Sequence, residues 1–266
     1  MSAHGAGYDT VDVAACTAAG VAVLNQAGSN AAAVAEHTLG LMLGLSKRIG
    51  ESDRRLHRGE RFTRADAMGR DLAGATLDIV GIGHAGRRVA ALARAFGMTV
   101  LACDALLKAA EIERRGAGAV SLPLLLQRSD VVSLHCPLDA ATKGLFGATE
   151  FAAMKPGALF ITTARGGIHD EAALHQALVS GHLGGAGLDV WQVEPPPLSH
   201  PLLQLDNVLA TAHTAGVTRG SHAAMASMAA AQIIGLARGE VPSRFVNPEV
   251  WPHLAARLAR QTRVST

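Results

Sequence analysis

A glycine-rich turn with the sequence GIGHAG, residues 81–86, stands between a short apolar run and a longer amphipathic one. The run from Thr76 to Val80 predicts a strand, and the residues from Arg87 to Phe96 predict a helix. A strand that enters a helix through closely spaced glycines opens a βαβ unit, because glycine permits the tight turn and the close approach of helix to strand. The turn therefore predicts a parallel sheet with helices packed on it.

The rest of the chain repeats this alternation of short apolar runs and alanine-rich amphipathic stretches. Several of the runs lack polar alternation, as expected for strands that are buried on both faces. Together they predict an α/β fold with a doubly wound parallel sheet. Strands are predicted at residues 21–24, 76–80, 99–102, 130–134, 158–162, 186–190 and 208–211, and long helices at 30–48, 170–180 and 218–238.

The composition of the chain argues against several classes of protein. The chain has 266 residues, of which 49% are hydrophobic and 17% are charged, so a folded globular protein is expected. Its three cysteines show no CxxC spacing, which predicts neither a disulfide framework nor a zinc cluster, and no other metal site is expected. No apolar run is long enough to span a membrane and no secretory signal is recognised, so we expect no membrane partner and residence in the cytoplasm.

The basic segment from Lys47 to Arg70 is a candidate surface for nucleic acid. However, acidic residues are interspersed in it, the net charge of the chain is only +2, and aromatic residues make up 3% of the sequence. Surfaces that bind nucleic acid combine a clustered positive charge with stacking aromatic side chains. We therefore interpret the segment as a solvated helix face and expect no nucleic-acid partner.

The glycine turn predicts a dinucleotide site. Gly81 and Gly83 would let the backbone approach a pyrophosphate, and the amides at the helix N-terminus favour an anion there. Asp104 follows the next predicted strand, where a carboxylate accepts hydrogen bonds from a ribose diol and repels a 2′-phosphate, so NAD is expected rather than NADP. Nearby basic residues could assist a phosphate and keep NADP open: Lys108, Arg114 and Arg115. The alternative is a strand-to-helix turn that binds no ligand.

Three further residues each follow a predicted strand: Arg165, Glu194 and His213. The carboxyl ends of parallel strands are where open α/β sheets bind ligands. A guanidinium there can grip a carboxylate or polarise a carbonyl. A histidine can take the hydroxyl proton when an alcohol is oxidised, and a neighbouring carboxylate can orient it. Each residue alone also has a structural interpretation, as a loop arginine that caps carbonyls, a surface glutamate before prolines, or one of 12 histidines.

Two other loops carry candidate residues. Asp189 is either an acceptor for a nicotinamide carboxamide or a turn acid that caps backbone amides. His135, Cys136 and Pro137 follow another predicted strand and are expected to shape the nucleotide cleft with their backbone. A catalytic Cys–His pair is the rival interpretation, but adjacent strand residues point to opposite faces.

These motifs resemble the D-isomer-specific 2-hydroxyacid dehydrogenase family, which includes 3-phosphoglycerate dehydrogenases and glyoxylate or hydroxypyruvate reductases. The resemblance covers nearly the whole chain, from HGAGYDTVDVAA to VNPEVW, and its most specific parts in combination are VGIGHAGRRVA, MKPGALFITTARGG, GLDVWQVEPPP and HTAGVT, in this order. It implies a Rossmann NAD-binding domain and an oxidoreductase that interconverts a D-2-hydroxy acid and a 2-oxo acid with NAD. It also implies a homodimer.

The resemblance assigns roles to individual residues. It implies Arg165 as the substrate-binding catalytic arginine, Glu194 as the partner of the histidine, and His213 as the proton donor or acceptor. Formate dehydrogenases of the superfamily carry glutamine at the position of Glu194, so a hydroxyacid substrate is favoured. Cofactor contacts are implied for Gly81, Gly83, His84, Ala85, Gly86, Asp104, Cys136, Thr142, Thr163, Ala164, Arg165, Asp189, His213 and Gly216, and substrate contacts for Ala6, Gly7 and Arg165.

The chain departs from the family pattern in two places. Ala212 stands where the family usually has a proline, and several βα units that precede the segment at His4 in other members are missing. We therefore expect residues 1–29 to be the remnant of a flavodoxin-like substrate domain, 30–216 to be the NAD-binding domain with its linking helix, and 217–266 to return to the substrate domain. On this interpretation the chain is N-terminally truncated. The alternative function is an NAD(H)-binding regulatory protein or a catalytically inactive truncated homologue.

Overall fold

The computed structural model describes residues 1–264 of the chain, with side chains described up to residue 258. The chain forms two compact units. Unit 1 comprises residues 1–33 and the chain from residue 216 onward, and unit 2 comprises residues 34–215. The predicted domain boundaries, after residues 29 and 216, stay a proposal. Among the described helices, none has the length and apolar character needed to cross a membrane.

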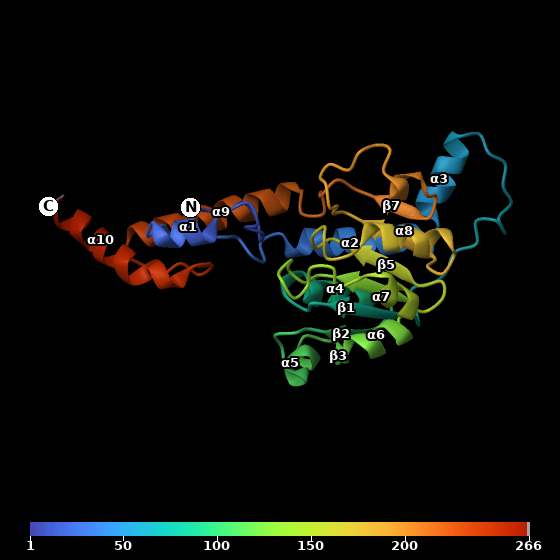
Figure 1. The fold of residues 1–266 in the computed structure, drawn as a ribbon, viewed down its shortest axis with the longest axis horizontal. Helices are drawn as coiled ribbons and strands as arrows, with labels where there is room; N and C mark the ends of the chain where they lie inside the picture. The colour runs from blue at the N-terminus through green and yellow to red at the C-terminus, as the bar shows by residue number, and fades with distance from the viewer. Residues whose placement is uncertain (265–266) are drawn as a thin grey trace. The chain divides into compact units, whose positions relative to one another are not determined.

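Unit 2 is built on a sheet of seven parallel strands in the order β3-β2-β1-β4-β5-β6-β7 (Figure 1). The strands are β1 (Thr76–Val80), β2 (Thr99–Cys103), β3 (Gly118–Ala119), β4 (Val131–Leu134), β5 (Leu159–Thr162), β6 (Gly185–Leu188) and β7 (Val208–Ala210). The strand order reverses between the neighbours β1 and β4, and such a switch point is where open α/β sheets bind ligands. The predicted doubly wound α/β fold is confirmed.

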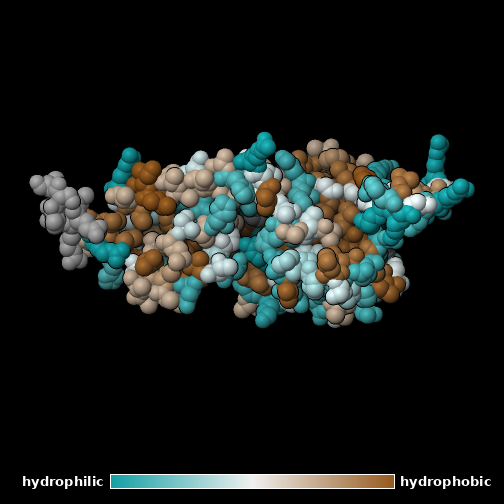
Figure 2. All heavy atoms as spheres, turned by 90° about the horizontal axis from the view of Figure 1, so that it is seen from above, coloured by the Kyte–Doolittle hydropathy of each residue, from teal (hydrophilic) through white to brown (hydrophobic). Residues whose placement is uncertain are grey.

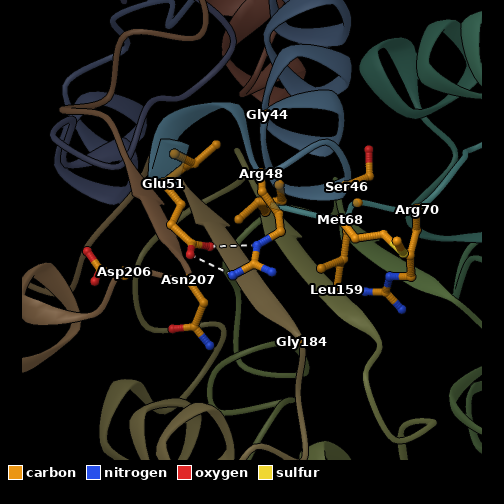
Figure 3. Close-up of a pocket in the computed structure, with 13 residues that line it drawn as sticks. Gly44, Ser46, Arg48, Glu51, Met68, Arg70, Leu159, Gly184, Asp206 and Asn207 are labelled. Atoms are coloured by element: carbon orange, nitrogen blue, oxygen red, sulfur yellow. Dashed lines mark hydrogen bonds and ion pairs between the residues drawn. The ribbon is translucent and has the colours of Figure 1, made fainter. Parts of the chain in front are cut away.

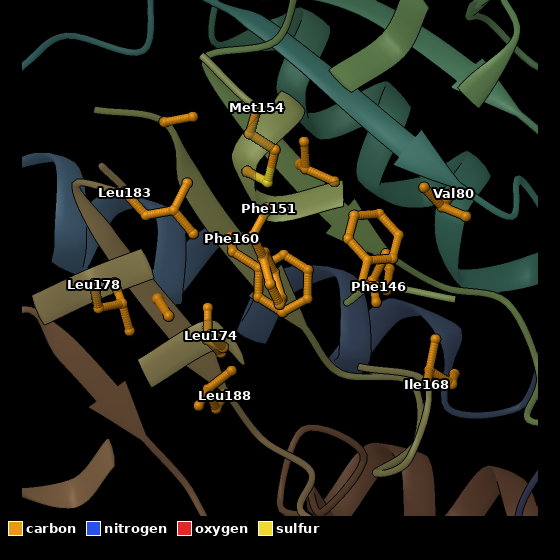
Figure 4. Packing of buried hydrophobic residues seen from close by; sticks show 14 of the residues in the cluster. Val80, Phe146, Phe151, Met154, Phe160, Ile168, Leu174, Leu178, Leu183 and Leu188 are labelled. Carbon is orange, nitrogen blue, oxygen red and sulfur yellow. The ribbon is translucent and has the colours of Figure 1, made fainter. Parts of the chain in front are cut away.

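Helices cover both faces of this sheet and bury an apolar cluster on each. Helices α2 (Ala31–Ser46), α4 (His84–Ala95) and α5 (Ala109–Arg114) contribute to one cluster, and α6 (Leu122–Arg128), α7 (Ala148–Ala153) and α8 (Glu171–Val179) to the other. Neighbouring residues of β4 divide between the two, with Val131 in the first and Val132 in the second, as the two-residue period of a strand requires. Figure 4 shows the second cluster, in which the rings of Phe146, Phe151 and Phe160 pack in tilted and T-shaped pairs with centroids 5.2 to 6.0 Å apart.

Unit 1 is held together by hydrogen bonds between segments that are distant in sequence. Val23 N donates to Asn247 Oδ1 at 2.8 Å, and Gln232 Nε2 donates to Asn25 O at 2.9 Å. The predicted strand at 21–24 is wrong, because among the described residues this segment finds only isolated bridges at Leu24 and no neighbouring strand. The helices of unit 1 are α1 (Val13–Ala18), α9 (Arg219–Ala237), the 3₁₀-helix η2 (Pro248–Val250) and α10 (Trp251–Val264).

Large apolar side chains lie on the surface of unit 1. Ile233 and Ile234 of α9 are each 51% exposed, and Val241, shortly after this helix, is 63% exposed. Figure 2 shows hydrophobic residues in brown among hydrophilic ones in teal over the face in view. The described part of unit 1 thus carries apolar surface that its own packing does not cover.

Two local differences from the predicted elements have clear causes. The helix predicted over 30–48 ends at Ser46, because Arg48 adopts a left-handed backbone with φ of 52°, and α3 (Ile49–His57) starts after it. Ile49, the first residue of α3, is 58% exposed. The strand β3 was not predicted, because two residues are too few to show a strand period.

Candidate active site

The three glycines of the turn after β1 have different surroundings. Gly81 has φ of 91°, and a Cβ on it would lie 2.7 Å from the backbone nitrogen of Cys136. A Cβ on Gly86 would lie 2.3 Å from the carbonyl oxygen of Gly81. A Cβ on Gly83, in contrast, would meet nothing within 4 Å. Close packing therefore requires glycine at positions 81 and 86, whereas Gly83 borders open space at the start of α4.

This open space fits a dinucleotide. The backbone amides of His84, Ala85 and Gly86 form the first turn of α4, whose N-terminus favours an anion. Asp104 directly follows the neighbouring strand β2, and its carboxylate accepts hydrogen bonds from the amides of Ile82 and Leu106, each at 3.0 Å. The carboxylate that was expected to meet the ribose is therefore fixed against the glycine turn.

The basic residues near Asp104 are largely engaged elsewhere. Arg114 pairs with Glu111, and Arg115 Nε donates to the same carboxylate at 2.7 Å. Arg115 also donates through Nη1 to the carbonyl oxygen of Ile82 at 2.8 Å. Two of the three side chains that could have assisted a 2′-phosphate are thus held by an acidic partner.

The loop after β4 lies against the glycine turn on the other side of the switch point. Cys136 contacts Gly81 through its backbone, and burial raises the pKa of its thiol to about 11. His135 bonds to Ser133 Oγ through Nε2 at 2.9 Å. Thr142 Oγ1 donates to Pro137 O at 2.6 Å and so closes the loop. A protonated thiol and a histidine bonded elsewhere do not support the rival Cys–His pair.

Arg165 follows β5 in a loop that packs tightly on a second loop. A Cβ on Gly166 would lie 1.8 Å from the carbonyl oxygen of Trp191, so only glycine fits at this contact. Arg165 Nη1 donates to Ala164 O at 2.7 Å, and Thr163 Oγ1 lies 3.3 Å from Thr38 Oγ1. The loop of the predicted substrate-binding arginine is therefore fixed against the loop that follows β6.

Glu194 and His213 are brought together, although each lies after a different strand. Glu194 Oε2 lies 2.7 Å from Nδ1 of His213, and Glu194 Oε1 accepts from the amide of Trp191 at 3.0 Å. His213 has a left-handed backbone with φ of 55°, and its amide donates to Asp189 O at 2.7 Å. Because an ionised carboxylate only accepts, Nδ1 of the ring carries the proton and Nε2 is left for a reaction partner.

Asp189 is fully buried and organises the loop that carries His213. Its Oδ1 accepts from Thr211 Oγ1 at 2.6 Å and from Thr214 N at 2.7 Å, and its Oδ2 accepts from Ala215 N at 2.9 Å. His37 Nε2 lies 3.7 Å from Oδ1. Both interpretations from the sequence remain compatible with this carboxylate, but in the structure its oxygens cap backbone amides.

The remaining predicted residues belong to unit 1. Ala6 and Gly7 lie in the segment before α1, and Gly216 lies at the boundary of the unit, where its carbonyl oxygen accepts from Ser221 Oγ. Their contacts with substrate and cofactor stay proposals. Sequence reasoning missed Trp191 and Gly166, which connect the loops that carry Arg165, Glu194 and His213. The two successive glycines after Arg165 were the available signal in the sequence.

A cavity of about 220 Å³ opens at the opposite edge of the sheet (Figure 3). It is bounded by Leu159, the first residue of β5, and by Asp206 and Asn207 ahead of β7, so it lies at the amino ends of the strands. Arg48 bonds to Glu51 there at 2.8 and 2.5 Å. The predicted site residues of unit 2 lie after the carboxyl ends instead. Among the described residues, no group of His, Cys, Asp and Glu side chains could hold a metal ion.

Comparison with known proteins identifies the family of the chain. Residues 39–215 match the family model described as "D-isomer specific 2-hydroxyacid dehydrogenase, NAD binding domain". The chain is 38% identical over 249 residues to a D-3-phosphoglycerate dehydrogenase of Archaeoglobus fulgidus, covering 93% of this chain and 47% of that protein. It is 37% identical over 253 residues to a glyoxylate reductase of Korarchaeum cryptofilum, covering 94% and 76%. The chain thus spans about half the length of the phosphoglycerate dehydrogenase.

Solved structures show the same fold. The D-lactate dehydrogenase of Aquifex aeolicus, in complex with NAD and lactic acid, is 30% identical, with a TM-score of 0.83 over 92% of this chain and 79% of that one. The matched NAD binding domain includes the glycine turn with its open space at Gly83, and NAD is the cofactor of this domain. From the family match and the fold together, the chain belongs to the D-isomer-specific 2-hydroxyacid dehydrogenases.

Proposed function

We propose that the chain acts as an NAD-dependent oxidoreductase that interconverts a D-2-hydroxy acid and a 2-oxo acid. The observation that carries the proposal is the 2.7 Å contact between His213 Nδ1 and Glu194 Oε2. It lies at the carboxyl edge of the same parallel sheet that presents the open glycine turn. Hydride must reach the carbonyl carbon and the proton must reach the oxygen bonded to it, so the groups for both transfers are expected at one edge of the sheet.

NADH, when bound, supplies the hydride that reduces the substrate carbonyl. In that direction Nε2 of His213 donates a proton to the carbonyl oxygen, and in the oxidation it takes the hydroxyl proton back. Glu194 holds the ring through Nδ1 and so fixes its orientation. Arg165 binds the substrate carboxylate and carbonyl oxygen with its planar guanidinium.

The substrate side of the proposal includes unit 1. Ala6 and Gly7 are proposed to contact the small 2-hydroxy or 2-oxo acid. Two further predictions accompany this function: assembly into a homodimer and residence in the cytoplasm.

The substitution His213→Ala tests the assignment. Removing the acid–base group is expected to lower turnover by roughly 10²- to 10⁴-fold, while NADH binding, followed by fluorescence titration, stays at the wild-type level. His57→Ala is the matched control, because the His57 side chain is 78% exposed on α3, and it is expected to keep full activity.

Turnover is measured by reductase assays on glyoxylate, hydroxypyruvate and 3-phosphohydroxypyruvate. Wild-type turnover in His213→Ala would refute the role of this histidine. A wild-type chain that binds NADH but reduces none of the three acids would instead support the regulatory or inactive alternative.

A further inference from the structure

A second carboxylate–histidine pair lies in unit 2 beside the Glu194–His213 pair. Glu171 is the first residue of α8, and its side chain is only 11% exposed, while that of His200 is 16% exposed. Glu171 Oε2 lies 3.1 Å from His200 Nε2, and Glu171 Oε1 accepts from the amide of Gln192 at 2.7 Å. His200 Nδ1 accepts from Leu202 N at 3.3 Å, which places the ring proton on Nε2, toward the carboxylate. Both oxygens of Glu171 thus hold other segments in place.

The segment that Glu171 holds is the one that carries Glu194. Residues 192–194 are exposed, so side-chain packing does little to set the position of this stretch. Gln192 is bonded to Glu171 through its amide, and the amide of the preceding residue, Trp191, donates to Glu194 Oε1 at 3.0 Å. The amides of two successive residues are therefore bonded to two different carboxylates.

The indole of Trp191 connects the same pair to the strand end before His213. The rings of Trp191 and His200 are T-shaped, with centroids 5.3 Å apart and an interplanar angle of 72°. Trp191 Nε1 donates to the carbonyl oxygen of Thr211 at 2.9 Å. A displacement of His200 would therefore reach the loop of His213 through this buried side chain.

We propose that Glu171 is a positioning residue for the acid–base pair. Together with His200 it fixes the peptide between Trp191 and Gln192, and this peptide sets the distance at which Glu194 meets Nδ1 of His213. The proposal rests on the proposed function and adds to it a residue that is not expected to touch substrate or cofactor.

Kinetics of Glu171→Ala provide the first test. We expect the variant to lose roughly tenfold or more in kcat, with the NADH dissociation constant unchanged, because only the alignment of the proton donor is disturbed. Glu171→Gln keeps an acceptor for the Gln192 amide and is expected to regain most of the lost kcat. His175→Ala is the control. His175 lies one turn further along α8 and lines a cavity of about 520 Å³ together with Glu171 and His200, and its loss is expected to leave kcat unchanged.

Coupling to Glu194 provides the second test. If Glu171 acts through Glu194, Glu171→Ala should cost no more than about twofold in kcat when it is added to Glu194→Gln. The same loss in both backgrounds would overturn the proposal, because independent residues give additive effects.

The closing experiment does not depend on turnover. In the full ¹⁵N-labelled chain without substrate, the ring nitrogens of His213, assigned with His213→Asn, report the tautomer at a pH where the ring is neutral. We expect the Nδ1–H form in the wild type and in His175→Ala, and a mixture of both tautomers in Glu171→Ala. A wild-type tautomer in Glu171→Ala, with only a lower Tm, would show a merely structural role and overturn the proposal. A shifted tautomer in a chain that reduces no 2-oxo acid would support the role of Glu171 and reject the proposed function.

Discussion

At the scale of single residues, Asp78 makes folding depend on pH. It lies within β1, is fully buried, and neither carboxyl oxygen has a hydrogen-bond partner among the described residues. Burial, aided by the nearby charge of Asp130, raises the pKa of Asp78 to about 8. The folded protein therefore keeps this proton up to about pH 8, whereas the unfolded chain loses it near pH 4. Its contribution to stability is complete below about pH 4 and is lost as the pH rises toward 8.

Asp78→Asn should remove this pH dependence, because an amide does not ionise. Relative to wild type, the free energy of unfolding of the variant is expected to rise with pH across the window, by at most about 1.4 kcal/mol per pH unit. Urea unfolding at several pH values measures this difference. Asp53→Asn, whose side chain is 65% exposed, should run parallel to wild type, and a wild-type slope in Asp78→Asn would disprove the pKa shift.

At the scale of elements, two glycines of the same turn are expected to have different roles, Gly83 in NADH binding and Gly86 in the stability of the fold. Gly83→Ala is expected to leave the Tm close to that of wild type, because the added methyl group meets no protein atom within 4 Å. The same methyl group would enter the open space at the turn, so the affinity for NADH is expected to fall roughly tenfold or more. Gly86→Ala should instead lower stability by about 1–3 kcal/mol, because its Cβ would lie 2.3 Å from Gly81 O. Thermal unfolding and NADH titration of both variants give the comparison, and equal losses of stability would contradict it.

The elements that were predictable are those with local signals. The strands around residues 76–80 and 158–162 were recognisable from apolar runs, and the helix predicted over 170–180 is α8. The break at Arg48 was not, because a left-handed backbone at arginine has no pattern in the sequence. The burial of Asp78 was not predicted either, because an aspartate is rarely fully buried without a partner for its carboxylate.

At the scale of the whole molecule, the edge of the sheet that carries the candidate site was predictable from the sequence, whereas the contacts between its loops were visible only in the structure. Arg165, Glu194 and His213 were predicted to lie at one edge because the carboxyl ends of parallel strands meet there. The roles of Trp191 and Glu171 could not be foreseen, because their contacts join loops that are distant in sequence.

The most direct test of the proposed function follows the transferred hydrogen. The full chain is incubated with hydroxypyruvate or 3-phosphohydroxypyruvate and NADH that carries deuterium at the transferable position, and the product is analysed by mass spectrometry and chiral chromatography. We predict a D-2-hydroxy acid with one deuterium on its C2 carbon, formed by the wild type and nearly abolished by His213→Ala. An L-product, or a wild-type chain that binds the labelled NADH and transfers no deuterium to either acid, would contradict the proposed function.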